Sequence, residues 1–97
     1  MSRISFKTDG GLTVVAGWDV PLQGYFLSVF DDANEDELTY ESLDDRNTRM
    51  GFRRDSAYFK DILVKLGIEA PIGFWELVEE NEGNVFYTFR NDGWVRR

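Results

Sequence analysis

The chain has 97 residues and a formal net charge of −7, and it contains neither cysteine nor histidine. These absences exclude disulfides, zinc sites of the Cys/His type, haem ligation by histidine, and Ser–His or Cys–His catalysis. Aromatic residues make up 15% of the chain, which is typical of a folded protein, and the length predicts a single domain over residues 1–97. We expect no cofactor and no bound metal.

Hydropathy gives no sign of a membrane or export signal. No stretch approaches the roughly 20 apolar residues that span a bilayer, and the segment 1–7 lacks the apolar core of a signal peptide. We therefore expect a cytoplasmic protein without membrane contact.

Alternation of apolar and polar residues predicts three strands in the first third of the chain, over residues 3–8, 12–16 and 24–30. Asp9-Gly10 between the first two predicts a hairpin. The third segment has apolar residues on both sides, with Phe26 and Phe30 opposite Leu27 and Val29, which favours a central strand covered on both faces. A weaker fourth strand is expected around Leu38.

The period changes to that of a helix after residue 55. Phe59, Ile62, Leu63 and Leu66 follow the i, i+3, i+4, i+7 spacing of one helix face. A second helix is expected to begin at Pro71, because proline suits the first turn, and its apolar side would carry Ile72, Trp75 and Val78. Residues 85–89 alternate again and predict a last strand.

These elements predict an α+β fold in the order β-β-β-(β)-α-α-β, with an antiparallel sheet and two short helices packed on one face. The strongest strand and the inner helix stripes should share one core. Its predicted members are Phe26, Leu27, Phe59, Ile62, Leu63, Leu66 and Trp75.

Charge is unevenly distributed along the chain. Residues 1–45 carry ten acids against two bases. The run from Asp31 to Glu37 is expected to form a turn or an exposed loop. The run does not match the calcium-binding loop of an EF-hand that would begin at Asp32. Glu37 stands at the position of the required glycine, and Leu43 stands at the position of the bidentate acid. Residues 46–54 carry four arginines and no acid; these could bind an anionic partner, but we favour pairing with the protein's own carboxylates.

The acidic run and one tryptophan are the candidate protein-binding residues. Tryptophan is enriched in binding hot spots, although Trp18 can equally fill a structural corner before Pro21. The candidates are Asp31, Asp32, Glu35, Asp36, Glu37 and Trp18. The sequence singles out no catalytic residue.

Part of the chain resembles a group of short bacterial proteins. The resembling segment covers residues 14–30, with a Gly-(Trp/Tyr)-Asp-x-Pro-Leu stretch that leads into an aromatic strand, and the similarity extends loosely to residues 66–71. The resemblance implies a bacterial or mobile-element origin. It implies no activity, so no functional residue is carried over.

We therefore expect a protein-binding module without enzymatic activity, whose partner presents a basic protein surface to the acidic half of the chain. Direct nucleic-acid binding is disfavoured by the net charge. Two alternatives are an acidic inhibitor that mimics nucleic acid, as in phage or plasmid proteins, and a small carboxylate-based enzyme. The oligomeric state is left open.

Overall fold

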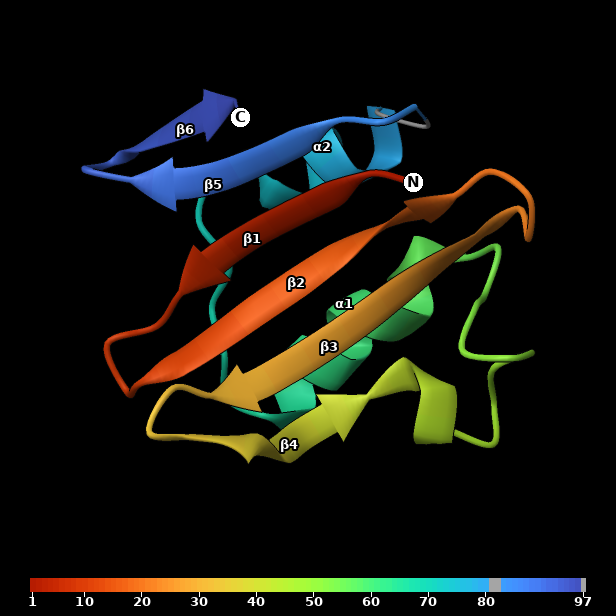
Figure 1. Cartoon of the computed structure of the whole chain (residues 1–97), viewed down its shortest axis with the longest axis horizontal. Coiled ribbons are helices and arrows are strands. Elements are labelled where there is room, and N and C mark those ends of the chain that lie inside the picture. Colours follow the sequence, from red (N-terminus) through yellow and green to blue (C-terminus); the bar gives the residue numbers. More distant parts are fainter. Residues whose placement is uncertain (81–82, 97) are drawn as a thin grey trace.

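The computed structural model describes residues 1–80 and 83–96, and in this part of the chain a six-stranded sheet packs against two helices (Figure 1). The predicted α+β class is confirmed. The elements in chain order are β1 (Arg3–Lys7), β2 (Leu12–Asp19), β3 (Gly24–Asp31), β4 (Asn34–Glu41), the 3-10 turn η1 (Ser42–Asp44), α1 (Ser56–Lys65), α2 (Phe74–Glu80), β5 (Phe86–Arg90) and β6 (Gly93–Arg96).

The sheet is mixed, with the strand order β4-β3-β2-β1-β5-β6. The first four strands form an antiparallel meander, as predicted. The prediction of a fully antiparallel sheet is wrong, because β5 pairs with β1 in parallel, with Ser5 opposite Thr88. A further strand that the sequence pattern does not predict, β6, forms a hairpin with β5. The chain thus returns to its first strand only after both helices.

The core lies between the sheet and the two helices, which both lie behind the sheet in Figure 1. Leu27, Phe59 and Leu63 belong to it as predicted, and Ile62 and Trp75 pack against its margin. Phe26 and Leu66 were wrongly assigned to it. The buried cluster consists of Ile4, Phe6, Val14, Ala16, Leu27, Val29, Phe59, Leu63, Ile68, Phe74 and Val78.

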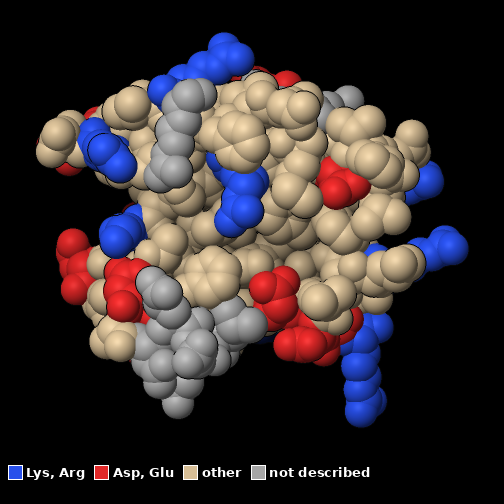
Figure 2. Space-filling view, in the orientation of Figure 1, with Lys and Arg blue, Asp and Glu red and all other residues tan. Residues whose placement is uncertain are grey.

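The second face of the sheet carries no helix in the described part of the chain. Since Leu27 and Val29 face the helices, Phe26 and Phe30 point to the opposite side by the two-residue period of a strand. The sequence predicts cover on both faces, at least partly, and the cover of this second face is indeed partial: Phe26 packs against Phe52 with ring centroids 6.0 Å apart, and Ser28 is buried. Figure 2 views this uncovered face, on which neutral side chains surround a Lys or Arg near the centre.

Several element boundaries differ from the prediction; β2, for example, continues to Asp19 instead of ending at residue 16. The acidic run is not one loop, because β3 continues to Asp31 and β4 begins at Asn34, leaving a short turn between them. The second helix begins at Phe74 rather than Pro71, because Gly73 has a φ of 90° that no helix contains. Ile72 is consequently 97% exposed.

Among the described residues, no helix has both the length and the apolar character that a membrane crossing would need.

Candidate functional site

The predicted acidic residues lie at one end of the β3–β4 hairpin. Asp31 accepts a hydrogen bond from the Ala33 amide at 2.9 Å. Asp32 accepts one from the Thr13 hydroxyl and lies 4.0 Å from the Lys7 ammonium. Glu35, Asp36 and Glu37 belong to the backbone of β4, and their side chains lie outside what the structure describes.

Trp18 lies at the other end of the same ladder. Leu12 pairs with Asp31 at one end of β2–β3, and Trp18 pairs with Tyr25 at the other, which separates them by about 20 Å at roughly 3.4 Å per residue. The Trp18 ring packs edge-on against Tyr25 with centroids 4.7 Å apart. The structure therefore does not unite Trp18 with the acidic run in one surface.

A different segment has the geometry of a site. Residues 45–55, which we call the arginine loop, connect η1 to α1 and fold back against the start of β3. Gly24 permits this contact, since a Cβ there would lie 2.7 Å from the Cβ of Phe52. Gly51 turns the loop with a φ of 91°. The backbone is thus fixed by two glycines and by an isolated bridge between Tyr25 and Arg53.

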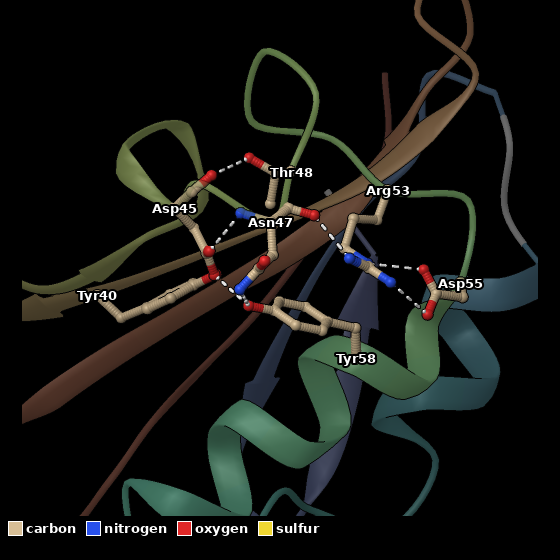
Figure 3. A network of polar contacts seen from close by, with 7 residues as sticks. All are labelled: Tyr40, Asp45, Asn47, Thr48, Arg53, Asp55 and Tyr58. Carbon is tan, nitrogen blue, oxygen red and sulfur yellow. Dashed lines mark hydrogen bonds and ion pairs between the residues drawn. The ribbon is translucent and has the colours of Figure 1, made fainter.

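Asp45 organises the interior of the arginine loop (Figure 3). Its Oδ2 accepts hydrogen bonds from the hydroxyls of Tyr40, at 2.6 Å, and Tyr58, at 2.7 Å. Its Oδ1 accepts from the Asn47 amide at 2.9 Å, and its carbonyl accepts from the Thr48 hydroxyl at 2.7 Å. Side chains from β4 and α1 are thereby joined through one carboxylate.

These contacts fix the charge state of the network. Hydrogen bonds from Tyr40, and then from Tyr58, hold the pKa of Asp45 below its ordinary value. Burial, followed by the hydrogen bond to Asp45, raises the pKa of Tyr40 above its ordinary value. At neutral pH the Tyr40 hydroxyl therefore donates a hydrogen bond to the ionised Asp45 carboxylate. Such a contact positions the loop and does not supply a nucleophile.

Arg53 holds the other half of the loop. Its Nε and Nη2 donate to the two carboxylate oxygens of Asp55 at 2.7 and 3.0 Å, and its Nη1 donates to the Asn47 carbonyl at 2.6 Å. The guanidinium also lies 4.1 Å from the centre of the Tyr58 ring. Such a bidentate, stacked arginine is geometrically constrained, and Figure 3 shows it between Asn47 and Asp55.

Asp45→Asn is expected to lower the free energy of unfolding at pH 7 by about 1–3 kcal/mol, the usual contribution of hydrogen bonds to a charged group. The pKa of Asp45 is depressed in the folded state, so its contribution is complete above the unfolded value of about 3.9 and is lost as pH falls through the folded value. Urea unfolding of both proteins between neutral and acid pH measures this. The difference between them should shrink on acidification, and a difference independent of pH would contradict the assignment.

A hollow of about 480 Å³ lies between the arginine loop and the β2–β3 turn. Its wall is both cationic and apolar. The side chains of Arg49 and Arg54 are exposed, and beside them Leu22 and Met50 are 48% and 68% exposed. Apolar side chains next to arginines are typical of the centre of protein interfaces. The hollow is lined by Leu22, Gln23, Arg49, Met50, Phe52 and Arg54, among others.

The charge of this hollow is only partly neutralised. Among the described side chains, Arg53 alone of the four loop arginines forms an ion pair, with Asp55. The prediction of internal pairing is thus confirmed for Arg53, whereas Arg46, Arg49 and Arg54 have no carboxylate partner in the part of the chain that is described. The signal in the sequence was a run of four arginines without an intervening acid.

Metal ligation finds no support in the described residues, where no three His, Cys, Asp or Glu side chains lie close enough together to hold an ion. The comparisons of the chain with family models, with curated proteins and with solved structures gave no match. The functional argument therefore depends on the geometry of the arginine loop.

Proposed function

We propose that this chain is a protein-binding module and that the arginine loop is its binding surface. The observation that carries the proposal is a pair of arginines, Arg49 and Arg54, without a carboxylate partner among the described side chains, beside a hollow walled by exposed Leu22 and Met50. Guanidinium groups bind carboxylates through two parallel hydrogen bonds. The partner is a protein segment that presents acidic side chains next to an apolar one.

The loop is held in place before a partner arrives. Asp45, Arg53 and the glycines at positions 24 and 51 constrain it through the contacts described above. A surface that is already ordered loses less conformational entropy on binding, so more of the contact free energy appears as affinity. Loops positioned by a rigid scaffold are also where binding residues commonly occur.

The test is a titration followed by fluorescence anisotropy, with a labelled synthetic peptide that combines glutamates with leucine. Arg49→Glu/Arg54→Glu is expected to weaken binding at least tenfold, because two attractive contacts become repulsive and about 1.4 kcal/mol corresponds to a tenfold change. Affinity should also fall as salt rises, since exposed charges are screened beyond about 8 Å in physiological salt.

A matched control separates the loop from net charge. Lys65→Glu/Arg96→Glu makes the same change in charge at exposed positions on α1 and β6, and it should change the affinity less than twofold. An equal loss of peptide affinity in both double variants would show that the effect depends on net charge and not on the arginine loop. A phosphorylated peptide of the same length distinguishes carboxylate from phosphate recognition. No binding of either peptide to the unmodified protein would reject the proposal.

A basic partner at the acidic end of the β3–β4 hairpin stays a separate prediction. Ten acids against two bases in residues 1–45 favour fast encounter with positive surfaces. Joint replacement of Asp31, Asp32, Asp36 and Glu37 by lysine should abolish association with a lysine-rich peptide and leave the acidic peptide bound. Unchanged association with the lysine-rich peptide would remove the acidic run from any binding role.

A further inference from the structure

The uncovered face of the sheet carries a row of mostly small side chains that lies outside the arginine loop. The strand registers place one row across all six strands, in the order Glu41, Ser28, Val15, Ser5, Thr88 and Val95. The four central members of this row are small or short. Val15, Ser5 and Thr88 form the floor of a hollow of about 460 Å³ that Phe30 borders on the β3 side and Phe86 on the β5 side.

Apolar side chains on this face remain open to solvent. Phe86 is 40% exposed and Val95 is 48% exposed, although both lie on strands of the sheet rather than in loops. Val15, at the centre of the row, is only 6% exposed. Exposed apolar side chains on the face of a sheet, here interleaved with Ser5 and Thr88, are typical of an interaction surface in soluble proteins.

The charges on the same face are separated into two halves. Arg3, Lys7 and Arg90 lie on β1 and β5 with side chains on this side by the strand period, whereas Asp32 and Glu41 lie at β3 and β4. In Figure 2 most Asp and Glu lie along the lower part, whereas Lys and Arg lie over the centre and upper part and also at the right and lower right. The boundary runs between β2 and β1, the midline of the sheet.

We propose that a second copy of this chain docks on the uncovered face, forming a two-fold symmetric dimer of facing sheets. A two-fold axis along the midline and parallel to the strands puts β4 over β6, β3 over β5 and β2 over β1 of the partner. The acidic half of each copy then lies over the basic half of the other. A surface that complements itself in this way is what an isologous interface requires.

This arrangement also accounts for the aromatic residues. Because β3 faces β5, Phe30 of one copy lies over the end of the other copy's β5, where Arg90 can stack on the ring. Phe86 lies over the start of the other copy's β3, where Phe26 points to the same side of the sheet. Facing sheets pack about 10 Å apart through such interdigitating side chains. This face adjoins the arginine loop, because Phe26 packs against Phe52 with ring centroids 6.0 Å apart, but the inference does not depend on binding at the loop.

Sedimentation velocity of the full chain over a range of concentrations tests the proposal. We expect a species of about twice the 11.3 kDa chain mass. Phe86→Asp should weaken dimerisation at least tenfold, because it places a charge in the centre of the interface. Ile72→Asp, at a fully solvated position outside this face, is the matched control and should leave dimerisation unchanged. Both sites are exposed, so both variants should fold.

A charge-swap cycle tests the orientation of the two copies. Asp32 and Arg90 lie at the ends of β3 and β5 that meet in the dimer, so Asp32→Arg and Arg90→Asp should each weaken it severalfold. The double variant, which has the original net charge, should recover most of the loss. A monomer at all concentrations, or a dimer insensitive to Phe86→Asp, would overturn the proposal. So would binding of a single-stranded oligonucleotide that Phe86→Asp abolishes, since that result assigns the face to nucleic acid.

Discussion

Phe59→Ala is expected to lower the free energy of unfolding by about 3–5 kcal/mol, the usual cost of truncating a buried aromatic residue. Phe59 is fully buried at the centre of α1 and contacts the core beneath β3. Its ring also meets Tyr58 edge-on with centroids 5.5 Å apart. The neighbouring backbone cannot collapse into the space, because α1 is held at its start by the arginine loop and at its end by the turn at Gly67.

Chemical denaturation with urea, monitored by tryptophan fluorescence, measures this loss. Small domains are stable by only about 5–15 kcal/mol, so the variant should unfold at a much lower denaturant concentration. Val64→Ala on the solvent side of the same helix is the control, since Val64 is largely exposed, and should change stability by no more than about 0.5 kcal/mol. Similar effects of the two substitutions would show that the buried stripe of α1 is wrongly assigned.

Gly17→Ala is expected to be the most damaging small substitution in the sheet. A Cβ at this position would lie 1.9 Å from the carbonyl oxygen of Ser2 and 2.7 Å from its carbonyl carbon. These are backbone atoms of the segment leading into β1, which is tied to β2 because the Ser2 amide donates to the Trp18 carbonyl and the Trp18 amide donates to the Ser2 hydroxyl, both at 2.9 Å.

The added methyl group must therefore separate the start of β1 from β2. Overpacking of this kind typically costs about 1–3 kcal/mol or more, and here it also breaks two hydrogen bonds. Differential scanning calorimetry measures the fall in melting temperature. Gly10→Ala is the matched control, because its nearest contact would be the Thr8 hydroxyl at 3.8 Å. A Gly17→Ala protein as stable as the Gly10→Ala protein would contradict the close packing of residue 2.

The local pattern of apolar and polar residues was sufficient to predict α1 and the first three strands. Phe59 and Leu63 were identified by helical spacing, and the two-residue period correctly separated Ile4 and Phe6 from their neighbours. The same period could not show whether a second layer covers Phe26 and Phe30, because that depends on where both helices pack. The parallel pairing of Ser5 with Thr88 joins segments 83 residues apart, and no local signal in the sequence reports such a contact.

Only part of the candidate site could be predicted from the sequence. The arginine run was recognised, but its internal pairing was misjudged for Arg46, Arg49 and Arg54, which have no carboxylate partner among the described residues, whereas Arg53 pairs with Asp55. Asp45, which organises the loop, looks in the sequence like one more surface acid. Its role depends on Tyr40 and Tyr58 converging from a strand and a helix, and that convergence is a property of the tertiary fold.

A map of amide chemical shifts during titration with the acidic peptide tests the central claim, that the arginine loop is the binding surface, most directly. The account predicts that the largest shifts fall in residues 21–24 and 47–55 and that they disappear in Arg49→Glu/Arg54→Glu. Shifts centred on β4, on the uncovered face of the sheet, or spread evenly over the chain would contradict it.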